Sequence, residues 1–102
     1  MALFSIEADG PHRLRARGEL GFETAAEALR AGLALLPKGQ PCTIDLAGVS
    51  DTDSAGLAVL VEWLAAAADG GGSVTFEAVP AQLRAIARIS DLEPLLFGHS
   101  GG

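Results

Sequence analysis

The sequence has little of several residue types that would indicate particular kinds of site. Its 102 residues include one cysteine, one tryptophan and no tyrosine. The single cysteine, Cys42, cannot form an internal disulfide, and its apolar surroundings predict a small buried side chain. The two histidines, His12 and His99, lie far apart and outside any cluster with the spacing of metal ligands. We therefore expect neither a metal site nor a bound cofactor.

Basic residues are also scarce. Seven lysines and arginines stand against thirteen acidic residues, which gives a formal net charge of −6. The sequence has no basic run or stripe that could follow a phosphate backbone. Nucleic acid is therefore not an expected partner.

The sequence has no long uninterrupted apolar run. The nearly apolar stretch 55–68 is shorter than the ~20 residues that span a bilayer, and Glu62 lies near its middle. The first residues, MALFSIEADG, lack the basic region and apolar segment of a secretory signal. We expect a soluble, cytoplasmic protein that meets a membrane only indirectly, through a complex.

The composition that remains suits one small domain. A hydrophobic content of 49% over 102 residues is enough for a single core but leaves no room for two domains. We predict one domain over residues 1–98, followed by a flexible tail over 99–102, where the sequence reads HSGG.

The first half of the chain predicts a hairpin followed by a helix. Apolar and polar residues alternate in 3–9 and again in 12–20, with a Gly-Pro turn between them. The segment 22–37 has helical periodicity, and Thr24 and Glu27 are spaced as a capping box at its start. Three leucines share one face of this predicted helix, namely Leu29, Leu33 and Leu36.

The second half predicts alternating strands and helices. The apolar run 42–48 suits a central strand buried on both faces, with Asp45 as the exception. A helix from Ser54 to about Asp69 follows, ended by DGGG, and then come a strand over 73–79 and a helix that begins at Pro80. DLEPLLF predicts a short last helix or an edge strand.

The predicted fold is therefore α/β, with the order β-β-α-β-α-β-α. It is a mixed sheet of four to five strands, with helices packed mainly on one face and parallel crossovers through the first two helices.

The helix that starts at Ser54 is apolar on nearly all sides. Leu57, Leu60, Val61, Leu64 and Ala68 form a stripe that suffices to pack on a sheet. The opposite side carries Val59, Glu62, Trp63 and Ala66, of which only Glu62 is charged. We predict that this side is an exposed docking surface with Trp63 as its anchor. The alternative is that Trp63 folds under a loop or a terminal segment.

An enzymatic role for Ser54 is not supported. A serine nucleophile needs a base within hydrogen-bond reach, and only His12 and His99 could serve. Asp45, Asp51 and Asp53 have no accompanying base, metal cluster or glycine-rich phosphate loop. We therefore predict that the protein is not an enzyme.

Ser54 lies where the helix must begin. Thr52, Asp53 and Ser54 are all residue types that cap helices, and one of them is expected to do so. A phosphoryl group on Ser54 would be favoured by free N–H groups and the helix dipole, but opposed by Asp51 and Asp53. It would add about −1.5 to −2 charges and expel a partner docked there by apolar contact.

With these elements placed, nearly the whole chain resembles a STAS domain, the fold of anti-sigma factor antagonists and sulfate-transporter tails. Three segments carry the resemblance: RGELGFETAAEALRAGL, TIDLAGVSDTDSAGLAVLVEW and GGGSVTFEAVPAQLRAIARISDLEPLL. The middle segment is the most specific of the three.

The resemblance implies a role for the junction before the central helix. It places the family's phosphorylation and partner-contact loop at Asp53, Ser54, Ala55, Gly56 and Leu57, with Ser54 as the phospho-acceptor. The sequence GELG departs from the family pattern, because nucleotide-dependent antagonists usually carry Asp where this chain has Gly21.

The chain's length, its acidity and the ending of its sequence are more similar to the Mla B-type subunit. That subunit is the cytoplasmic STAS component of a phospholipid-transporting ABC complex, where it binds the ATPase.

Two hypotheses follow from this resemblance. In the favoured one, the protein is a non-catalytic accessory subunit that binds and supports the ATPase of an Mla-type transporter. In the alternative, it is an anti-sigma factor antagonist that binds an anti-sigma kinase and is switched by phosphorylation of Ser54. The oligomeric state stays open. The expected partner-binding residues are Thr52, Asp53, Ser54, Ala55, Gly56, Leu57, Val59, Glu62, Trp63 and Ala66.

Overall fold

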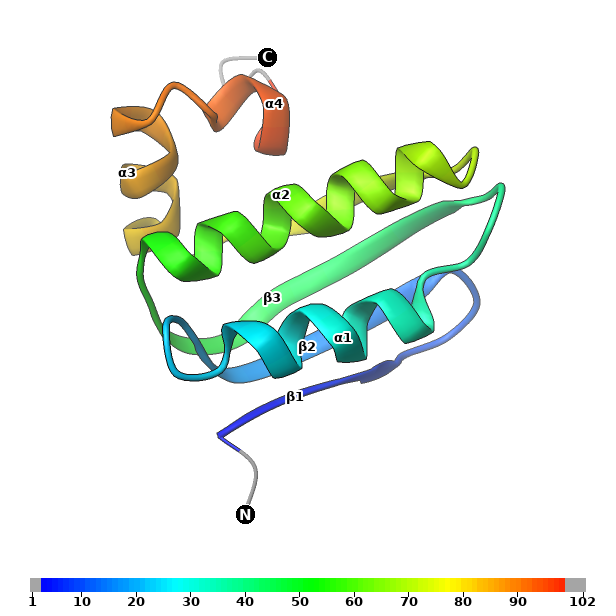
Figure 1. The fold of residues 1–102 in the computed structure, drawn as a ribbon, viewed down its shortest axis with the longest axis horizontal. Coiled ribbons are helices and arrows are strands. Elements are labelled where there is room, and N and C mark those ends of the chain that lie inside the picture. Colours follow the sequence, from blue (N-terminus) through cyan, green and yellow to red (C-terminus); the bar gives the residue numbers. More distant parts are fainter. Residues whose placement is uncertain (1–2, 99–102) are drawn as a thin grey trace.

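The computed structural model describes residues 3–98 and confirms the predicted order of elements (Figure 1). The elements are β1 (Phe4–Ala8), β2 (Arg13–Leu20), α1 (Ala25–Leu35), β3 (Pro41–Thr52), α2 (Ser54–Asp69), β4 (Ser73–Glu77), α3 (Ala81–Ile89) and α4 (Glu93–Phe97). The last segment is thus a helix rather than an edge strand. The predicted tail, 99–102, and with it His99, lie outside the described residues.

The sheet has four strands in the order β1-β2-β3-β4. β1 and β2 form the predicted antiparallel hairpin, whereas β2, β3 and β4 are parallel to one another. Helices α1 and α2 lie on the same face of this mixed sheet, and α3 and α4, which follow β4 in the chain, lie beside α2 (Figure 1).

β3 is longer than predicted and is not buried on both faces. It continues past Gly48 to Thr52, with two register shifts against β2. Buried and more exposed residues alternate over its first half, so the side away from the helices faces solvent. The interpretation of this strand as buried on both faces is wrong, because the helices cover only one face. Asp45 is therefore not a charged residue in a fully buried strand, since it lies on the side of the sheet that the helices leave uncovered.

We call this solvent-facing side the open sheet face. Its ion-paired residues are Glu7, Asp9, Arg13, Arg15, Arg17, Asp45 and Glu77. Each acid of this set pairs with an arginine of β2. The closest contacts are Arg17 to Glu7 at 2.6 Å, and Arg15 to Asp9 and Arg13 to Glu77, both at 2.9 Å. Exposed pairs of this kind contribute little to stability, but together they leave no acid of this set without a cationic neighbour.

Helix α1 begins and packs differently from its prediction. The Thr24 hydroxyl does not cap the helix, so the predicted capping box with Glu27 is absent. It accepts instead from the Gly21 N–H (3.1 Å) and donates to the Glu19 carbonyl (2.9 Å), which fixes the preceding loop. The buried residues of α1 are small, Ala28 and Gly32, whereas Leu33 is 42% exposed. Of the three leucines predicted to share one helical face, Leu33 is thus largely at the surface, and Leu29 and Leu36 are partly buried.

Trp63 occupies the space that these small residues leave. Its side chain is 0% exposed, and its indole N–H donates to the Leu29 carbonyl at 3.4 Å. A Cβ on Gly32 would clash with the indole, lying 2.7 Å from its Cζ2 atom. Val59, on the same side of α2, is 4% exposed. The predicted exposed docking surface at Val59 and Trp63 is thus wrong, because α1 covers both side chains.

Two other expectations concern the core and the membrane. Cys42 is buried as predicted, and this burial raises the pKa of its thiol. Over residues 3–98, none of the helices has the length and apolar character needed to cross a bilayer.

Candidate partner-docking site

The carboxyl ends of β2 and β3 bring two loops together at one edge of the sheet. Because parallel strands end on the same side, the β2–α1 loop (21–24) lies beside the turn from β3 into α2. Thr52, the last residue of β3, pairs in register with Leu20, the last residue of β2. We call this edge, with the start of α2, the loop end of the molecule.

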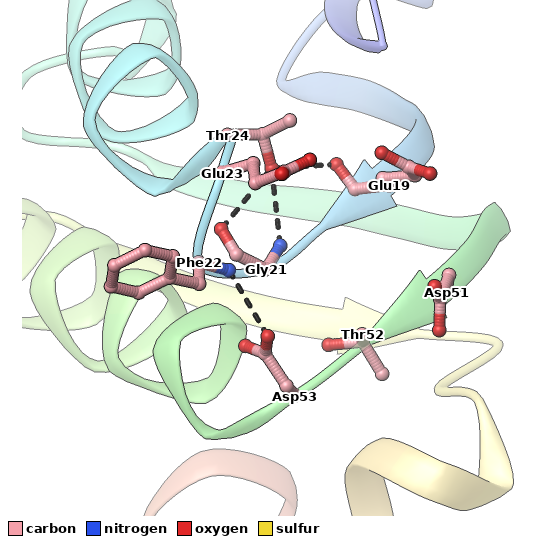
Figure 2. A pocket seen from close by; sticks show the side chains of 8 residues that line it. All are labelled: Glu19, Gly21, Phe22, Glu23, Thr24, Asp51, Thr52 and Asp53. Atoms are coloured by element: carbon pink, nitrogen blue, oxygen red, sulfur yellow. Dashed lines mark hydrogen bonds between the residues drawn. The ribbon is translucent and has the colours of Figure 1, made fainter.

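Asp53 joins the two loops. As N-cap of α2, it accepts hydrogen bonds at Oδ1 from the backbone N–H groups of Ala55 (2.9 Å) and Gly56 (3.2 Å). Its Oδ2 accepts from the backbone N–H of Phe22 at 3.1 Å (Figure 2). The bond from Phe22 and those from the two helix amides hold the pKa of Asp53 below its ordinary value. The expectation that one of the three candidate residues caps the helix is confirmed, and that residue is Asp53.

Ser54 is the first helical residue and is exposed. Because Asp53 already occupies the N–H groups of Ala55 and Gly56, those two amides are not free to receive a phosphoryl group on Ser54. The next amide, Leu57 N–H, bonds to the Asp53 carbonyl. The prediction that free backbone amides would stabilise a phosphoryl group on Ser54 is therefore wrong for the N–H groups of Ala55, Gly56 and Leu57.

Three predicted contact residues lie beneath this surface. Thr52, Gly56 and Leu57 are buried. A Cβ on Gly56 would clash with the Leu20 carbonyl and lie 2.6 Å from Thr52 Oγ1, so glycine permits the start of α2 to approach β2 and β3 closely. These residues can shape the loop end, but they offer little surface to a partner.

The outer side of α2 lies between two shallow grooves. Ser54, Ala58 and Glu62 are exposed along it at helical spacing, and we call them the outer stripe. One groove, of about 270 Å³, runs between α1 and α2 and is lined by Ala25, Ala26, Leu29, Ala55, Ala58, Val59 and Glu62. The other, of about 350 Å³, is lined by Ser54, Leu57, Ala58, Val61, Glu62, Ser90 and Leu92. Ala66, the last of the predicted contact residues, is partly buried and lines a hollow farther along α2.

Sequence reasoning missed the most exposed apolar residues near these grooves. Phe22 is 82% exposed, just before α1, and Ile89 is 86% exposed at the end of α3. Phe22 was assigned to the first predicted helix. Its place directly after the strand that ends GEL could have indicated a loop at the carboxyl edge of the sheet.

Acidic side chains surround the base of the β2–α1 loop, which carries Phe22. Glu19, Glu23, Asp51 and Asp53 line an open pocket of about 290 Å³ together with Gly21, Phe22, Thr24 and Thr52. Figure 2 shows the Phe22 ring pointing away from Glu19 and Asp51. Within residues 3–98, none of the four carboxylates has an ion-pair partner.

The geometry offers Ser54 no base from His12. His12 lies in the turn before β2, whereas Ser54 follows the carboxyl end of β3, which is parallel to β2. The two residues are therefore at opposite ends of the sheet. In the described part of the chain, no group of three or more histidine, cysteine or acidic residues is arranged to hold a metal ion.

Comparison with known proteins agrees with this fold. The family model described as Mlab, STAS domain matches residues 5–97. A search of curated proteins finds no significant match.

Solved structures share the fold at low sequence identity. A Thermotoga maritima protein described as a proposed anti-sigma factor antagonist superposes with a TM-score of 0.70 at 16% identity, covering 92% of this chain and 83% of that one. The anti-sigma factor antagonist SpoIIAA, in its unphosphorylated form, gives a TM-score of 0.63 at 13% identity, with coverage of 84% and 82%.

Proposed function

The chain belongs to the STAS-domain family of the Mlab type, and we propose that it is a non-catalytic subunit that binds the ATPase of a phospholipid-transporting ABC complex. In this role it acts in the cytoplasm and meets the membrane only through the complex. Docking uses the loop end and the outer stripe of α2.

The observation that carries this proposal is the exposed outer stripe between two apolar grooves. Ala58 has a minimal side chain, so a partner can approach the α2 backbone closely and place apolar side chains in the grooves on either side. Ser54 adds a hydroxyl that can donate and accept hydrogen bonds at the end of this strip. Such a surface suits a stable protein contact rather than a small-molecule reaction.

The alternative, an antagonist switched by phosphorylation of Ser54, is supported by the described activity of the structural neighbours and by the exposure of Ser54. Two features weigh against it. The capping amides are occupied by Asp53, so they do not favour a phosphoryl group. A Cβ on Gly21 would lie 2.8 Å from Asp53 Oδ2, so the Asp that antagonists usually carry there would disturb the Asp53 hydrogen bonds.

The test uses the purified ATPase subunit of an Mla-type transporter from the source organism and, in parallel, an anti-sigma kinase from the same organism. Affinities are measured for the wild type, Ser54→Ala and Ser54→Asp. We expect the wild type to bind the ATPase, Ser54→Ala to bind nearly as well, and Ser54→Asp to bind at least ~30-fold more weakly, because a charge is added within the contact.

Two results would decide against the proposal. One is an absence of binding between the wild type and the ATPase. The other is quantitative phosphorylation of Ser54 by the kinase, together with tight binding of the unphosphorylated form to that kinase, which would establish the antagonist role. Ala68→Asp is the control for added charge, because Ala68 is exposed near the other end of α2.

A further inference from the structure

The loop end combines an exposed aromatic ring with carboxylates that lack cationic neighbours. We propose that Phe22 is an anchor that inserts into an apolar pocket of the partner, and that lysine or arginine side chains on the rim of that pocket pair with the surrounding carboxylates. This inference rests on the proposed function, since it specifies the chemistry of the surface that the ATPase would present.

Phe22 is exposed and yet held in place. Its side chain is 82% exposed, while its backbone N–H is fixed to Asp53 at 3.1 Å. The Thr24 hydroxyl accepts from the Gly21 N–H at 3.1 Å and donates to the Glu19 carbonyl at 2.9 Å, so the loop is closed on itself and joined to the end of β2. A ring on a backbone that is already ordered loses less conformational freedom on binding. Large aromatic side chains of this kind contribute strongly when a partner buries them.

Two of the carboxylates around the loop come from neighbouring strands. Glu19 and Asp51 lie opposite each other in the register of the parallel strands β2 and β3, and neither has an ion-pair partner within residues 3–98. The open sheet face shows that the same strands can pair their acids, since Asp45 of β3 lies 3.5 Å from Arg13 of β2. The loop end therefore presents uncompensated negative charge, which attracts and orients a basic partner surface.

The charge also limits what can cover Phe22. A second copy of this chain, docked by the same surface, would bring another set of these carboxylates against the first. A metal ion is not favoured either, because within residues 3–98 no group of acidic residues has the arrangement of a metal site. A basic protein surface supplies both the cations and the apolar pocket.

The first arm of the test measures binding of the purified ATPase subunit to the wild type, Phe22→Ala and Leu35→Ala. Leu35 is the matched control, because it is a 39% exposed apolar residue at the far end of α1. We expect Phe22→Ala to raise the Kd by about 30-fold or more, and Leu35→Ala to leave it unchanged. Circular dichroism and thermal melting establish that each variant is folded.

The second arm measures association rates over a series of salt concentrations for Glu23→Gln, Asp51→Asn and the control Asp69→Asn. Asp69 is exposed at the other end of α2, so its substitution makes the same change in net charge away from the loop end. We expect the two loop-end variants to associate more slowly and with a weaker dependence on salt, and Asp69→Asn to behave as the wild type.

The outcomes separate this inference from the proposed function. If the wild type does not bind the ATPase, the proposed function fails and this inference fails with it. If the wild type binds and Ser54→Asp does not, but Phe22→Ala binds as the wild type does, the anchor alone is overturned. The charged rim is overturned if Asp69→Asn changes the salt dependence as much as the loop-end variants do. Self-association of the isolated chain that Phe22→Ala abolishes would overturn the inference in favour of a second copy.

Discussion

The two sides of α2 differ in their side chains and in their surroundings. Val59 and Trp63 face α1 and are buried, whereas Ser54, Ala58 and Glu62 face solvent. The difference arises from the neighbouring helix, because Gly32 leaves room for the indole of Trp63 against α1. The apolar side of α2 that carries Val59 and Trp63 is therefore an interface inside the domain, because α1 covers it.

The two sides of α2 therefore have separate roles. The side facing α1 stabilises the domain through packing and the hydrogen bond from Trp63 to Leu29. The outer stripe, with small or polar side chains, contributes little packing to the domain and is available to a partner. Substitutions on the side facing α1 should therefore change stability, and substitutions on the outer stripe should change the affinity for the partner.

The largest effect is expected from Trp63→Ala. Removal of a fully buried tryptophan should lower the free energy of unfolding by about 3–5 kcal/mol, because it leaves a cavity between α1 and α2. Urea denaturation measures this loss. Under conditions where the variant remains folded, its affinity for the ATPase should be unchanged. A loss of affinity with normal stability would instead show that Trp63 reaches the partner.

The opposite pattern is expected from Ala58→Glu. Glutamate is nearly as good a helix former as alanine, so the stability should change little. Affinity for the ATPase should fall by ~2 kcal/mol or more, because a long charged side chain would occupy the centre of the outer stripe. Isothermal titration calorimetry measures this fall. Ala68→Glu, on an exposed turn near the end of the same helix, should bind normally.

Gly32→Ala tests the packing between α1 and α2 from the other helix. The added methyl group would clash with the indole of Trp63, at a cost of about 1–3 kcal/mol, partly offset by ~1 kcal/mol from the higher helix propensity of alanine. Thermal melting measures the net loss. In the Trp63→Phe background, the same change should cost less, since the smaller ring leaves space. Equal costs in both backgrounds would contradict direct packing.

Asp53→Asn should have the smallest effect, and the effect should depend on pH. Hydrogen bonds to the carboxylate hold the folded-state pKa of Asp53 below its ordinary value of 3.8. The stabilisation is therefore fully present above that ordinary value and is lost as the pH falls through the lower folded-state pKa.

The difference in stability between the wild type and Asp53→Asn should thus be larger near neutral pH than in strong acid. Urea denaturation at several pH values measures it. Asp51→Asn is the control, because Asp51 is exposed and does not cap a helix. A difference that grows as the pH falls would contradict the hydrogen-bonded role of Asp53.

Local sequence patterns were sufficient for much of the fold. The bounds of α2 were predicted because three helix-capping residue types, Thr52, Asp53 and Ser54, and the DGGG segment provide start and stop signals at its two ends. The burial of Trp63 could not be predicted in this way, since it depends on Gly32 in a different helix. The exposure of Phe22 likewise depends on how two loops meet at the sheet edge. The site residues that sequence reasoning misplaced are those whose surroundings come from distant parts of the chain.

We propose that the partner docks on the loop end and the outer stripe. Hydrogen–deuterium exchange of this chain, with and without the purified ATPase subunit, can locate the surface that the partner covers. We predict slower exchange on binding in residues 21–26 and 53–62, and no change in β1 or the first half of β2, which form part of the open sheet face. Protection confined to the open sheet face, with residues 53–62 unchanged, would show that the partner docks elsewhere.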